Sequence, residues 1–445
     1  DYKELAYVIL KEFLTDYSEK ELKYCINSAY DEKFDTEKIA PISKVGDDYV
    51  LELYHGPTCA FKDMALTIMP YLLKTAIEKN NLKEEVVILT ATSGDTGKAA
   101  LEGFKDVDKI KIVVFFPENG VSNIQKLQMK TTGGNNTCVV GINGNFDDAQ
   151  TGVKNIFADN NFNKDLKEKG YILSSANSIN IGRLTPQVVY YFYSYLQLVK
   201  QNEIALGDEI NFVVPTGNFG NILAGYYAKQ MGLPVNKFIC ASNDNNVLYD
   251  FFETGVYNKN RELKLTTSPS MDILISSNLE RLLFEISNRD SKKVNSLLND
   301  LNEKGVYEID YDMRKNLSSF YAGYSKEDVV SKTIKEVFDK FDYLLDTHTA
   351  VAYSCYEKYV EDTKDDTKTV IVSTASPYKF SKDVINSIQS IDCNLDDFEI
   401  INKLSDLSKT KIPGPIEKLK ELEIRHNITC EKDELKSEIL KFLGK

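Results

Sequence analysis

Short apolar runs alternate with amphipathic stretches from about residue 86 onward. The runs are rich in β-branched side chains, and between them apolar positions recur at helical spacing, as over residues 180–200 and 218–231. Buried strands that alternate with helices are typical of βαβ units on a parallel sheet. The pattern therefore predicts an α/β fold with strands at residues 86–92, 111–116, 137–142, 171–175, 211–216, 237–242 and 369–374.

The rest of the chain carries charged, helical patterns. One such interval, about 255–345, indicates a helical insertion. The first 48 residues are also charged and helical, and because the chain begins at Asp1 rather than Met, we expect part of this segment to be missing. The expected organisation is an N-terminal helical segment at 1–48, a large domain formed by 49–85 and 146–445, and a small mobile α/β domain at 86–145.

Composition narrows the range of partners. The chain has 67 acidic against 54 basic residues and a formal charge of −13, which disfavours binding to nucleic acid or anionic membranes. No apolar run has transmembrane length, and no signal peptide opens the chain. The seven cysteines form no CxxC pair and the three histidines lie far apart, so we expect no disulfide framework and no metal site. The expectation is a cytoplasmic monomer or homodimer that acts on a small molecule.

The most informative lysine lies in the segment YHGPTCAFKDMALTIMPYLLK, residues 54–74. HGPT is a turn, Thr58 is a candidate N-cap, and the apolar positions that follow recur at helical spacing, so Lys62 is expected in the first turn of a helix. The partial positive charge of a helix N-terminus favours the neutral amine, which is the form that attacks an aldehyde. For a lysine taken alone, a solvated side chain at a helix start is the commoner alternative.

Two glycine-bearing turns after strands offer anion sites. In ATSGDTGKAALEG (91–103) and PTGNFGNILAGYYAK (215–229), hydroxyls and close backbone N–H groups stand at a helix N-terminus, where a phosphate or carboxylate binds well. The first turn fails the P-loop pattern because Thr92 and Ala99 occupy its key positions, and the second fails the dinucleotide-binding spacing. An ordinary βα turn is the alternative for the first segment.

Two further strand ends carry polar side chains. SSANSINIGRL (174–184) clusters donors on one βα turn, and its Arg183 suits a bidentate contact with phosphate or carboxylate, although a surface arginine beside asparagine caps is equally compatible. STASPYKF (373–380) places Ser373 and Thr374 at the carboxyl edge of a sheet, where open α/β folds bind ligands. Either hydroxyl is a candidate partner for a pyridine nitrogen.

Taken together and in this order, these segments resemble the threonine synthase family. The resemblance spans about residues 50–380 and rests on HGPTCAFKD, SGDTG, SANSINIGR, PTGNFGN, SPSMDILISSNLERLLFE, HTAVAY and STASPYKF. The pairing of HGPTxAFKD with a downstream GNFGN makes it specific. The chain departs from the common family pattern at Ser376, where His is frequent, and at Cys59, where Leu is frequent.

The resemblance implies a pyridoxal 5′-phosphate (PLP) enzyme of fold type II, the tryptophan synthase β-like fold. Its two parallel-sheet domains would hold the cofactor in the cleft between them, with a helical insertion in the large domain. Lys62 would bind the cofactor aldehyde as a Schiff base and shuttle protons. The residues implied as cofactor-binding are Lys62, Asp95, Gly217, Asn218, Phe219, Gly220, Asn221 and Thr374, and those implied as substrate-binding are Ser93, Thr96, Ser178, Asn180 and Arg183.

The implied reaction is that of a PLP-dependent carbon–oxygen lyase acting on phosphates. It converts O-phospho-L-homoserine and water to L-threonine and phosphate by γ-elimination and β-addition, the last step of threonine biosynthesis. One alternative is a related PLP lyase, such as a threonine/serine dehydratase or a phospholyase for the same substrate. The other is a ligand-binding protein on a retained scaffold, without catalysis.

Overall fold

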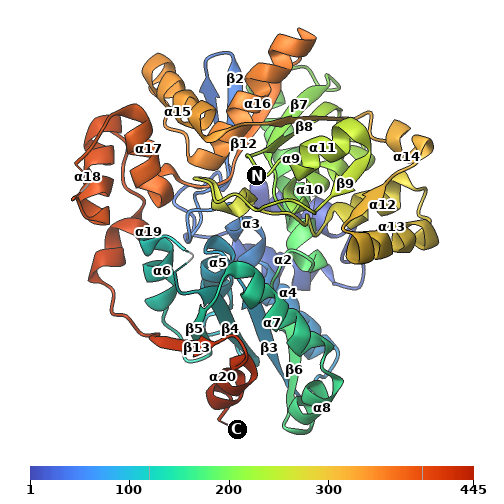
Figure 1. The fold of residues 1–445 in the computed structure, drawn as a ribbon, viewed down its shortest axis with the longest axis vertical. Coiled ribbons are helices and arrows are strands. Elements are labelled where there is room, and N and C mark those ends of the chain that lie inside the picture. Colours follow the sequence, from blue (N-terminus) through green and yellow to red (C-terminus); the bar gives the residue numbers. More distant parts are fainter. Residues whose placement is uncertain (120, 393, 445) are drawn as a thin grey trace.

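The computed structural model describes residues 1–119, 121–392 and 394–444, and its framework is a pair of sheets (Figure 1). In the described residues, the large sheet has six strands in the order β1 (Ile42–Val45), β2 (Asp48–Glu52), β12 (Thr369–Ser373), β7 (Ile210–Pro215), β8 (Val235–Ser242) and β11 (Phe320–Tyr324). The small sheet has five, in the order β13 (Ile428–Glu431), β5 (Thr137–Asn143), β4 (Ile110–Pro117), β3 (Glu85–Ala91) and β6 (Tyr171–Ser175). Apart from the β1–β2 pair, neighbouring strands in both sheets run parallel.

Side chains alternate between two cores across the large sheet, as successive residues of a strand must. On β7, Phe212 and Val214 belong to one core and Val213 to the other. The first core packs against α1 (Tyr2–Leu10), α2 (Glu19–Ala29), α3 (Asp63–Leu66), α9 (Ile181–Lys200), α10 (Gly220–Gln230), α11 (Val247–Thr254), α12 (Leu279–Ile286), α13 (Ser291–Lys304) and α14 (Tyr311–Lys315). The second packs against α15 (Glu327–Phe341), α16 (Thr347–Thr363), α17 (Ser381–Ile388) and α18 (Asp397–Ser408).

The small sheet is buried on both faces in the same way. One core includes side chains of α4 (Met69–Lys79), α5 (Asp95–Phe104) and α6 (Asn123–Lys130). The other includes side chains of α7 (Phe146–Ala158), α8 (Asn160–Glu168) and α20 (Leu435–Phe442). The inner strands of both sheets therefore show the continuous apolar burial that is typical of parallel sheets, and all seven strands predicted from the sequence are present.

The segment expected as a helical insertion is less uniform than its charge pattern indicates. It holds α12 to α15, but also an antiparallel pair, β9 (Val256–Asn258) with β10 (Val306–Glu308), and the edge strand β11. The strand β11, sequence FYAGY, pairs in parallel with β8. Its aromatic side chains fit a pleated, half-buried surface, but five residues between charged helices give too short a periodic signal to be recognised.

The small sheet draws on distant parts of the chain. The segment 86–145 supplies β4, β5 and nearly all of β3, and β6 and β13 join them from outside that range. The connection from α18 passes through α19 (Gly414–Glu417) and the short 3₁₀ turn η3 (Lys418–Glu421) before β13 pairs with β5. The last helix, α20, then packs on α7, so the described C-terminal end lies at the far tip of the small sheet (Figure 1).

Parallel pairing decides where the functional turns lie. The carboxyl ends of parallel strands meet at one edge of a sheet, and the turns that follow β3, β6, β7 and β12 all leave from such edges. Short 3₁₀ turns, η1 (Pro269–Met271) and η2 (Pro377–Phe380), lie in two of the neighbouring loops. Among the described helices, none combines the length and apolar character needed to cross a bilayer.

An ion cluster ties the N-terminal segment to the large sheet. His55 follows β2, and its Nδ1 lies 2.6 Å from Asp35 and its Nε2 2.9 Å from Glu52. Glu52 also accepts hydrogen bonds from Ser43 and Tyr343. Burial opposes a charge on His55, but the two carboxylates outweigh it and raise the pKa of His55 to about 9.

The His55 cluster should make stability fall at alkaline pH. Because the folded-state pKa lies above the unfolded value of about 6.5, the contribution is complete below that value and is lost as pH rises through about 9. Replacing His55→Asn should therefore cost about 1–3 kcal/mol at pH 6 and little at pH 10, measured by thermal melts across this range. His426, whose pKa burial lowers, is the control, because His426→Asn should show no pH dependence between 7 and 10. An equal cost of His55→Asn at both pH values would contradict the assignment.

Candidate active site

A cavity of about 190 Å³ lies where the two sheets present their carboxyl ends. It is lined from the large-sheet side by the turns after β7 and β12, and from the small-sheet side by the turns after β3 and β6. Helix α7 and the loop around η1 close its remaining walls. The cavity therefore gathers the strand-end segments that the sequence singles out.

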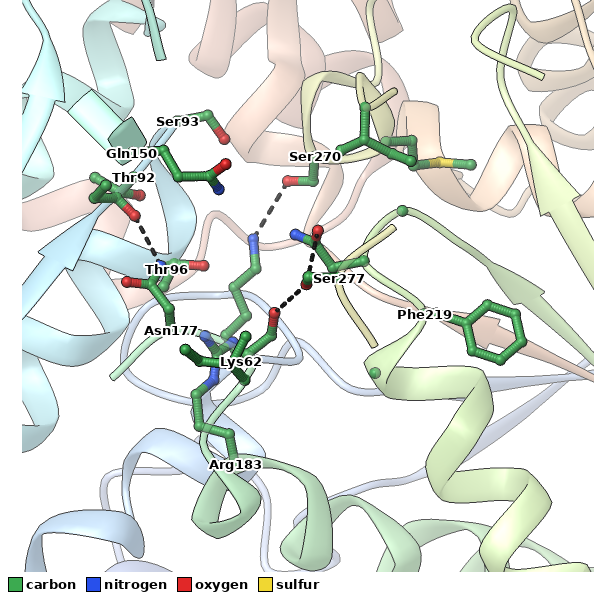
Figure 2. A pocket seen from close by; sticks show the side chains of 18 of the residues that line it. Lys62, Thr92, Ser93, Thr96, Gln150, Asn177, Arg183, Phe219, Ser270 and Ser277 are labelled. Carbon is green, nitrogen blue, oxygen red and sulfur yellow. Dashed lines mark hydrogen bonds between the residues drawn. The ribbon is translucent and has the colours of Figure 1, made fainter. Parts of the chain in front are cut away.

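Lys62 projects into the middle of this cavity. Figure 2 shows its side chain rising between the turn that carries Ser93 and Thr96 and the loop that carries Ser270. Its Nζ donates to the Ser270 hydroxyl at 3.3 Å and lies 3.6 Å from a carboxylate oxygen of Asp95. The structure places Lys62 at the N-cap of the short helix α3, one position before the expected first turn.

The surroundings of Lys62 favour its neutral amine. Burial is the largest effect and lowers the pKa of Lys62 to about 8, Arg183 and Lys379 act in the same direction, and Asp95 opposes them. A lysine with this pKa has a far larger neutral fraction near pH 7 than a solvated one. The amine is therefore poised as a nucleophile toward a carbonyl.

The expected cap of this helix is reversed in the structure. Thr58 does not accept a hydrogen bond from the helix; its backbone N–H and hydroxyl both donate to the Asp63 carboxylate, at 2.8 and 2.6 Å. The side chain of Asp63, at the first helical position, thereby fixes the HGPT turn instead. A Cβ on Gly56 would lie 2.5 Å from that carboxylate, which explains why the turn carries a glycine.

The turn after β7 holds a strained residue at the start of α10. Phe219 has a φ of +63°, in the left-handed region that non-glycine residues seldom adopt, and its ring points away from the cavity (Figure 2). A Cβ on Gly217 would lie 2.5 Å from the Ser270 carbonyl oxygen, whereas one on Gly220 would meet nothing closer than 3.5 Å. Gly217 is thus required by packing, while Gly220 leaves space beside the first turn of α10, whose N–H groups lack helical partners.

Two buried donors along the cavity have no hydrogen-bond partner among the described residues. They are Nε of Arg183 and Nδ2 of Asn221. The Arg183 guanidinium donates through Nη1 to the Ala176 carbonyl at 2.9 Å, and the Asn221 oxygen accepts from Tyr190 and Tyr191. Because an unsatisfied buried donor is costly, its persistence beside a cavity points to a ligand that supplies acceptors.

The turn after β3 uses part of its backbone internally. The Thr92 hydroxyl accepts the N–H groups of Gly94 and Gly97, each at 2.9 Å. These two N–H groups are therefore used within the turn and do not face the cavity. Ser93 and Thr96 do line the cavity and remain available to a ligand.

Two residues of the turn after β6 have different roles, one at the cavity and one at the start of a helix. Ser178 lines the cavity and shares a hydrogen bond with Ser277, which in turn donates to Asn218. Asn180 is not among the lining residues; it is the N-cap of α9, where its side chain accepts from Gly182 N–H and donates to the Ser175 carbonyl.

The structure also separates the two hydroxyls that end β12. Thr374 lines the cavity, whereas the Ser373 hydroxyl is buried against Thr349 at 2.9 Å. The Thr374 carbonyl accepts the Phe61 N–H at 2.8 Å, which holds this strand end beside Lys62. Of the two candidates from the sequence, Thr374 is the one in reach of a ligand.

Comparisons with known proteins agree with this geometry. A family model described as "Pyridoxal-phosphate dependent enzyme" matches residues 43–375, and one described as "Threonine synthase, C-terminal" matches residues 349–428. Threonine synthase of Pseudomonas aeruginosa is 39% identical over 86% of this chain and 79% of its own length. The chain belongs to the threonine synthase family.

Solved members of the threonine synthase family share the fold. The crystal structure of threonine synthase from yeast superposes with a TM-score of 0.87 at 32% identity and covers 100% of this chain and 89% of that one. The PLP-bound threonine synthase from Brucella melitensis gives 0.86 at 35% identity, over 99% and 89%. The predicted resemblance and the PLP fold type II architecture are both confirmed.

Some relatives in this family are much longer. Human threonine synthase-like 1 is 43% identical over 88% of this chain, but this chain spans only 54% of that protein's length. The curated mammalian relatives of this name therefore contain about as much additional sequence as they share with this chain.

Several lining residues of this threonine synthase-family site escape sequence reasoning. Gln150 and Lys154 reach the cavity from α7, whose amphipathic pattern resembles that of any surface helix. His348, in the segment HTAVAY, accepts the Ser270 N–H at Nε2 and faces Asp346 at 3.1 Å through Nδ1. Its Nε2 is therefore the unprotonated nitrogen, and it anchors the loop that contacts Lys62.

We expect Arg183 to lower the stability of the ligand-free protein while it strengthens the binding of an anion. A buried guanidinium with an unpartnered Nε costs folding free energy, so Arg183→Met should stabilise the ligand-free protein by about 1–3 kcal/mol. The same change should remove most of the stabilisation that inorganic phosphate gives, because a charge-assisted hydrogen bond contributes about 1.5–3 kcal/mol. Thermal melts with and without phosphate measure both effects.

Arg261, which pairs with Asp250 at 2.9 Å and does not line the cavity, supplies the matched control. Arg261→Met should not stabilise the protein and should leave the phosphate effect intact. A destabilised Arg183→Met protein that still responds fully to phosphate would show that Arg183 is structural.

Proposed function

We propose that this chain is a PLP-dependent threonine synthase that converts O-phospho-L-homoserine and water to L-threonine and phosphate. The observation that carries the proposal is the meeting, in one cavity, of the buried Lys62 amine with the unpartnered donors of Arg183 and Asn221. The first suits an aldehyde and the others suit anionic oxygens. Both chemistries are needed for a phosphorylated amino-acid substrate and a phosphorylated cofactor.

The residues present fit PLP. Lys62 would hold its aldehyde, and the turn 217–221 at the N-terminus of α10 would hold its phosphate, where Gly220 leaves space and Asn221 has a spare donor. Thr374 would face its ring nitrogen with a neutral hydroxyl rather than a carboxylate. When bound, PLP supplies an electron sink that stabilises negative charge on the substrate carbons.

The protein's own groups would divide the remaining work. Lys62 Nζ, once released from the cofactor, is the base that takes the proton from the substrate Cα and moves protons at Cβ. Arg183, Ser178, Ser93 and Thr96 would bind the substrate carboxylate and phosphate. The apolar side chains of Phe61 and of Val153 and Phe157 on α7 would limit the access of bulk water, so that one water adds at Cβ.

The proposal extends to the setting of the enzyme. A cytoplasmic monomer or homodimer with a Schiff-base lysine, acting on a small molecule alone, is consistent with an acidic chain of the threonine synthase family. A related lyase, such as a dehydratase or a phospholyase, is the alternative against which this proposal is tested.

Product analysis decides between these reactions. The purified protein with PLP and O-phospho-L-homoserine should form L-threonine and phosphate in equal amounts. Chromatography measures the threonine, and a phosphate assay measures the phosphate. Lys62→Ala should lower turnover by about 10³-fold or more, because it removes both the aldehyde anchor and the proton carrier. Lys200→Ala, at the far end of α9, is the control. Formation of 2-oxobutyrate instead of threonine would assign the related lyase activity.

Thr374 should matter for rate more than for cofactor attachment. Thr374→Val should keep the visible absorption of bound PLP but slow threonine formation by about tenfold, since only the hydroxyl at the ring nitrogen is lost. Ser373→Ala should change the spectrum little, because the Ser373 hydroxyl pairs with Thr349. Absorption spectra and turnover of the two proteins test this. The reverse result, with normal Thr374→Val and altered Ser373→Ala, would transfer the role to Ser373.

A further inference from the structure

A row of three charged side chains leads from Lys62 in the cavity to Asp95 and Lys379 behind its wall. Lys62 Nζ lies 3.6 Å from Oδ2 of Asp95, and Oδ1 of the same carboxylate lies 2.8 Å from Lys379 Nζ. The side chains of Lys62, Asp95 and Lys379 are only 11%, 4% and 0% exposed. One carboxylate is thus shared between two lysines, and both the carboxylate and Lys379 are almost fully buried.

The carboxylate is held from the small-sheet side. Asp95 is the first residue of α5, directly after the turn that follows β3, and Gln125 of α6 donates to its Oδ1 at 2.9 Å. Burial alone would raise the pKa of Asp95, but Lys379 and then Lys62 outweigh it and hold that pKa well below its usual range. Asp95 is therefore a permanent anion.

Lys379 is fixed from both sides of the cleft. It belongs to η2, after the large-sheet strand β12, and its Nζ also donates to the Thr58 carbonyl at 2.9 Å and to Gln128 of α6 at 3.3 Å. These partners leave it turned toward Asp95 and away from the cavity, where it is not a lining residue. Its charge therefore stays in place when a ligand enters.

The distances decide what this charge does. A carboxylate paired with Lys62 alone would stabilise the protonated amine and suppress its nucleophilicity. Lys379 takes the shorter contact, 2.8 Å against 3.6 Å, so the main ion pair excludes Lys62. In addition, a second cation in a buried site repels a proton on Lys62.

We propose that Lys379 is a positioning residue for Lys62: by holding Asp95 in a permanent ion pair, it orients the carboxylate beside the Lys62 amine without letting that carboxylate keep the amine protonated. Asp95 remains close enough to direct the amine. The inference concerns the proposed cofactor lysine and thus deepens the proposed function, but it is a statement about this chain's own side chains.

Other charged groups around this row do not replace Lys379. Arg183 of α9 also repels a proton on Lys62, but its guanidinium faces the cavity and would be engaged by a bound anion. Burial raises the pKa of Cys59 to about 12, so its thiol stays neutral, and Asp63, whose pKa burial raises to about 6, accepts the N–H and hydroxyl of Thr58. Asp272, His348 and Lys154 face Lys62 from the other walls of the cavity.

The test is the titration of Lys62 in the full chain without cofactor. Brief labelling with acetic anhydride from pH 6 to 11, followed by peptide mass spectrometry, gives the pH midpoint of Lys62 reactivity. Lys379→Met should move this midpoint upward by about one pH unit, which reduces labelling at pH 7 about tenfold. Asp95→Asn should move it downward, and Lys379→Arg should restore it to within about 0.3 unit.

A matched control separates this effect from general loss of a buried cation. Lys98 is also buried, in α5, and pairs with Glu102 and Thr132 rather than with Asp95. Lys98→Met should leave the Lys62 midpoint unchanged. Opposite shifts for Lys379→Met and Asp95→Asn support the proposal, since a merely structural role would not reverse sign.

The proposal is overturned if folded Lys379→Met titrates like the wild type, or if Asp95→Asn shifts the midpoint in the same direction as Lys379→Met. Should Lys379→Met fail to fold, Asp95→Asn and Lys379→Arg decide it, because an unchanged midpoint in Asp95→Asn or a shifted one in Lys379→Arg contradicts it. The readout needs neither PLP nor substrate. A protein that makes no threonine but shows these shifts would refute the proposed function alone.

Discussion

The meeting of two sets of strand ends is the constraint on which the site depends. Parallel strands deliver their carboxyl-terminal turns to one edge, and here the edges of both sheets border one cavity. Neither sheet holds a complete set of groups: the large-sheet side supplies Thr374 and the turn 217–221, and the small-sheet side supplies Ser93 and Thr96. A ligand is contacted from both sides only while the two sheets keep this relative position. Catalysis in this cavity therefore depends on how the two sheets are placed.

The buried charged and polar groups at this site lower the free energy of unfolding. A buried amine, a buried guanidinium with a spare donor and a carboxylate between two lysines would each cost free energy in an ordinary core. They persist because large apolar cores on both faces of each sheet offset that cost. The unfavourable polar groups of this site thus stand where a charged ligand can compensate for them.

Sequence patterns predicted the parts of this arrangement that are local. Seven strands, a helix that starts within one residue of Lys62, and the glycine-bearing turns follow from apolar runs, breakers and cap residues that lie close together in the chain. Arg183 was recognised for the same reason. The ion pair of Asp95 with Lys379 could not be, because 284 residues separate the partners (379 − 95) and only the packing of η2 against α5 and α6 brings them together. Gln150 and Lys154 were missed because α7 carries no motif, and the role of Thr58 was reversed because a cap and a donor look identical in sequence.

The position of β13 in the chain affects the order in which the small sheet can be completed during synthesis. It covers one edge of β5 and follows every strand of the large sheet in the chain, whereas the other strands of the small sheet are made before the large sheet is half complete. During synthesis, β5 must therefore wait with unpaired backbone groups on one side until every strand of the large sheet has been made. The nascent chain thus carries an open strand edge while the large sheet is being made, and such an edge is a site where a chaperone can bind.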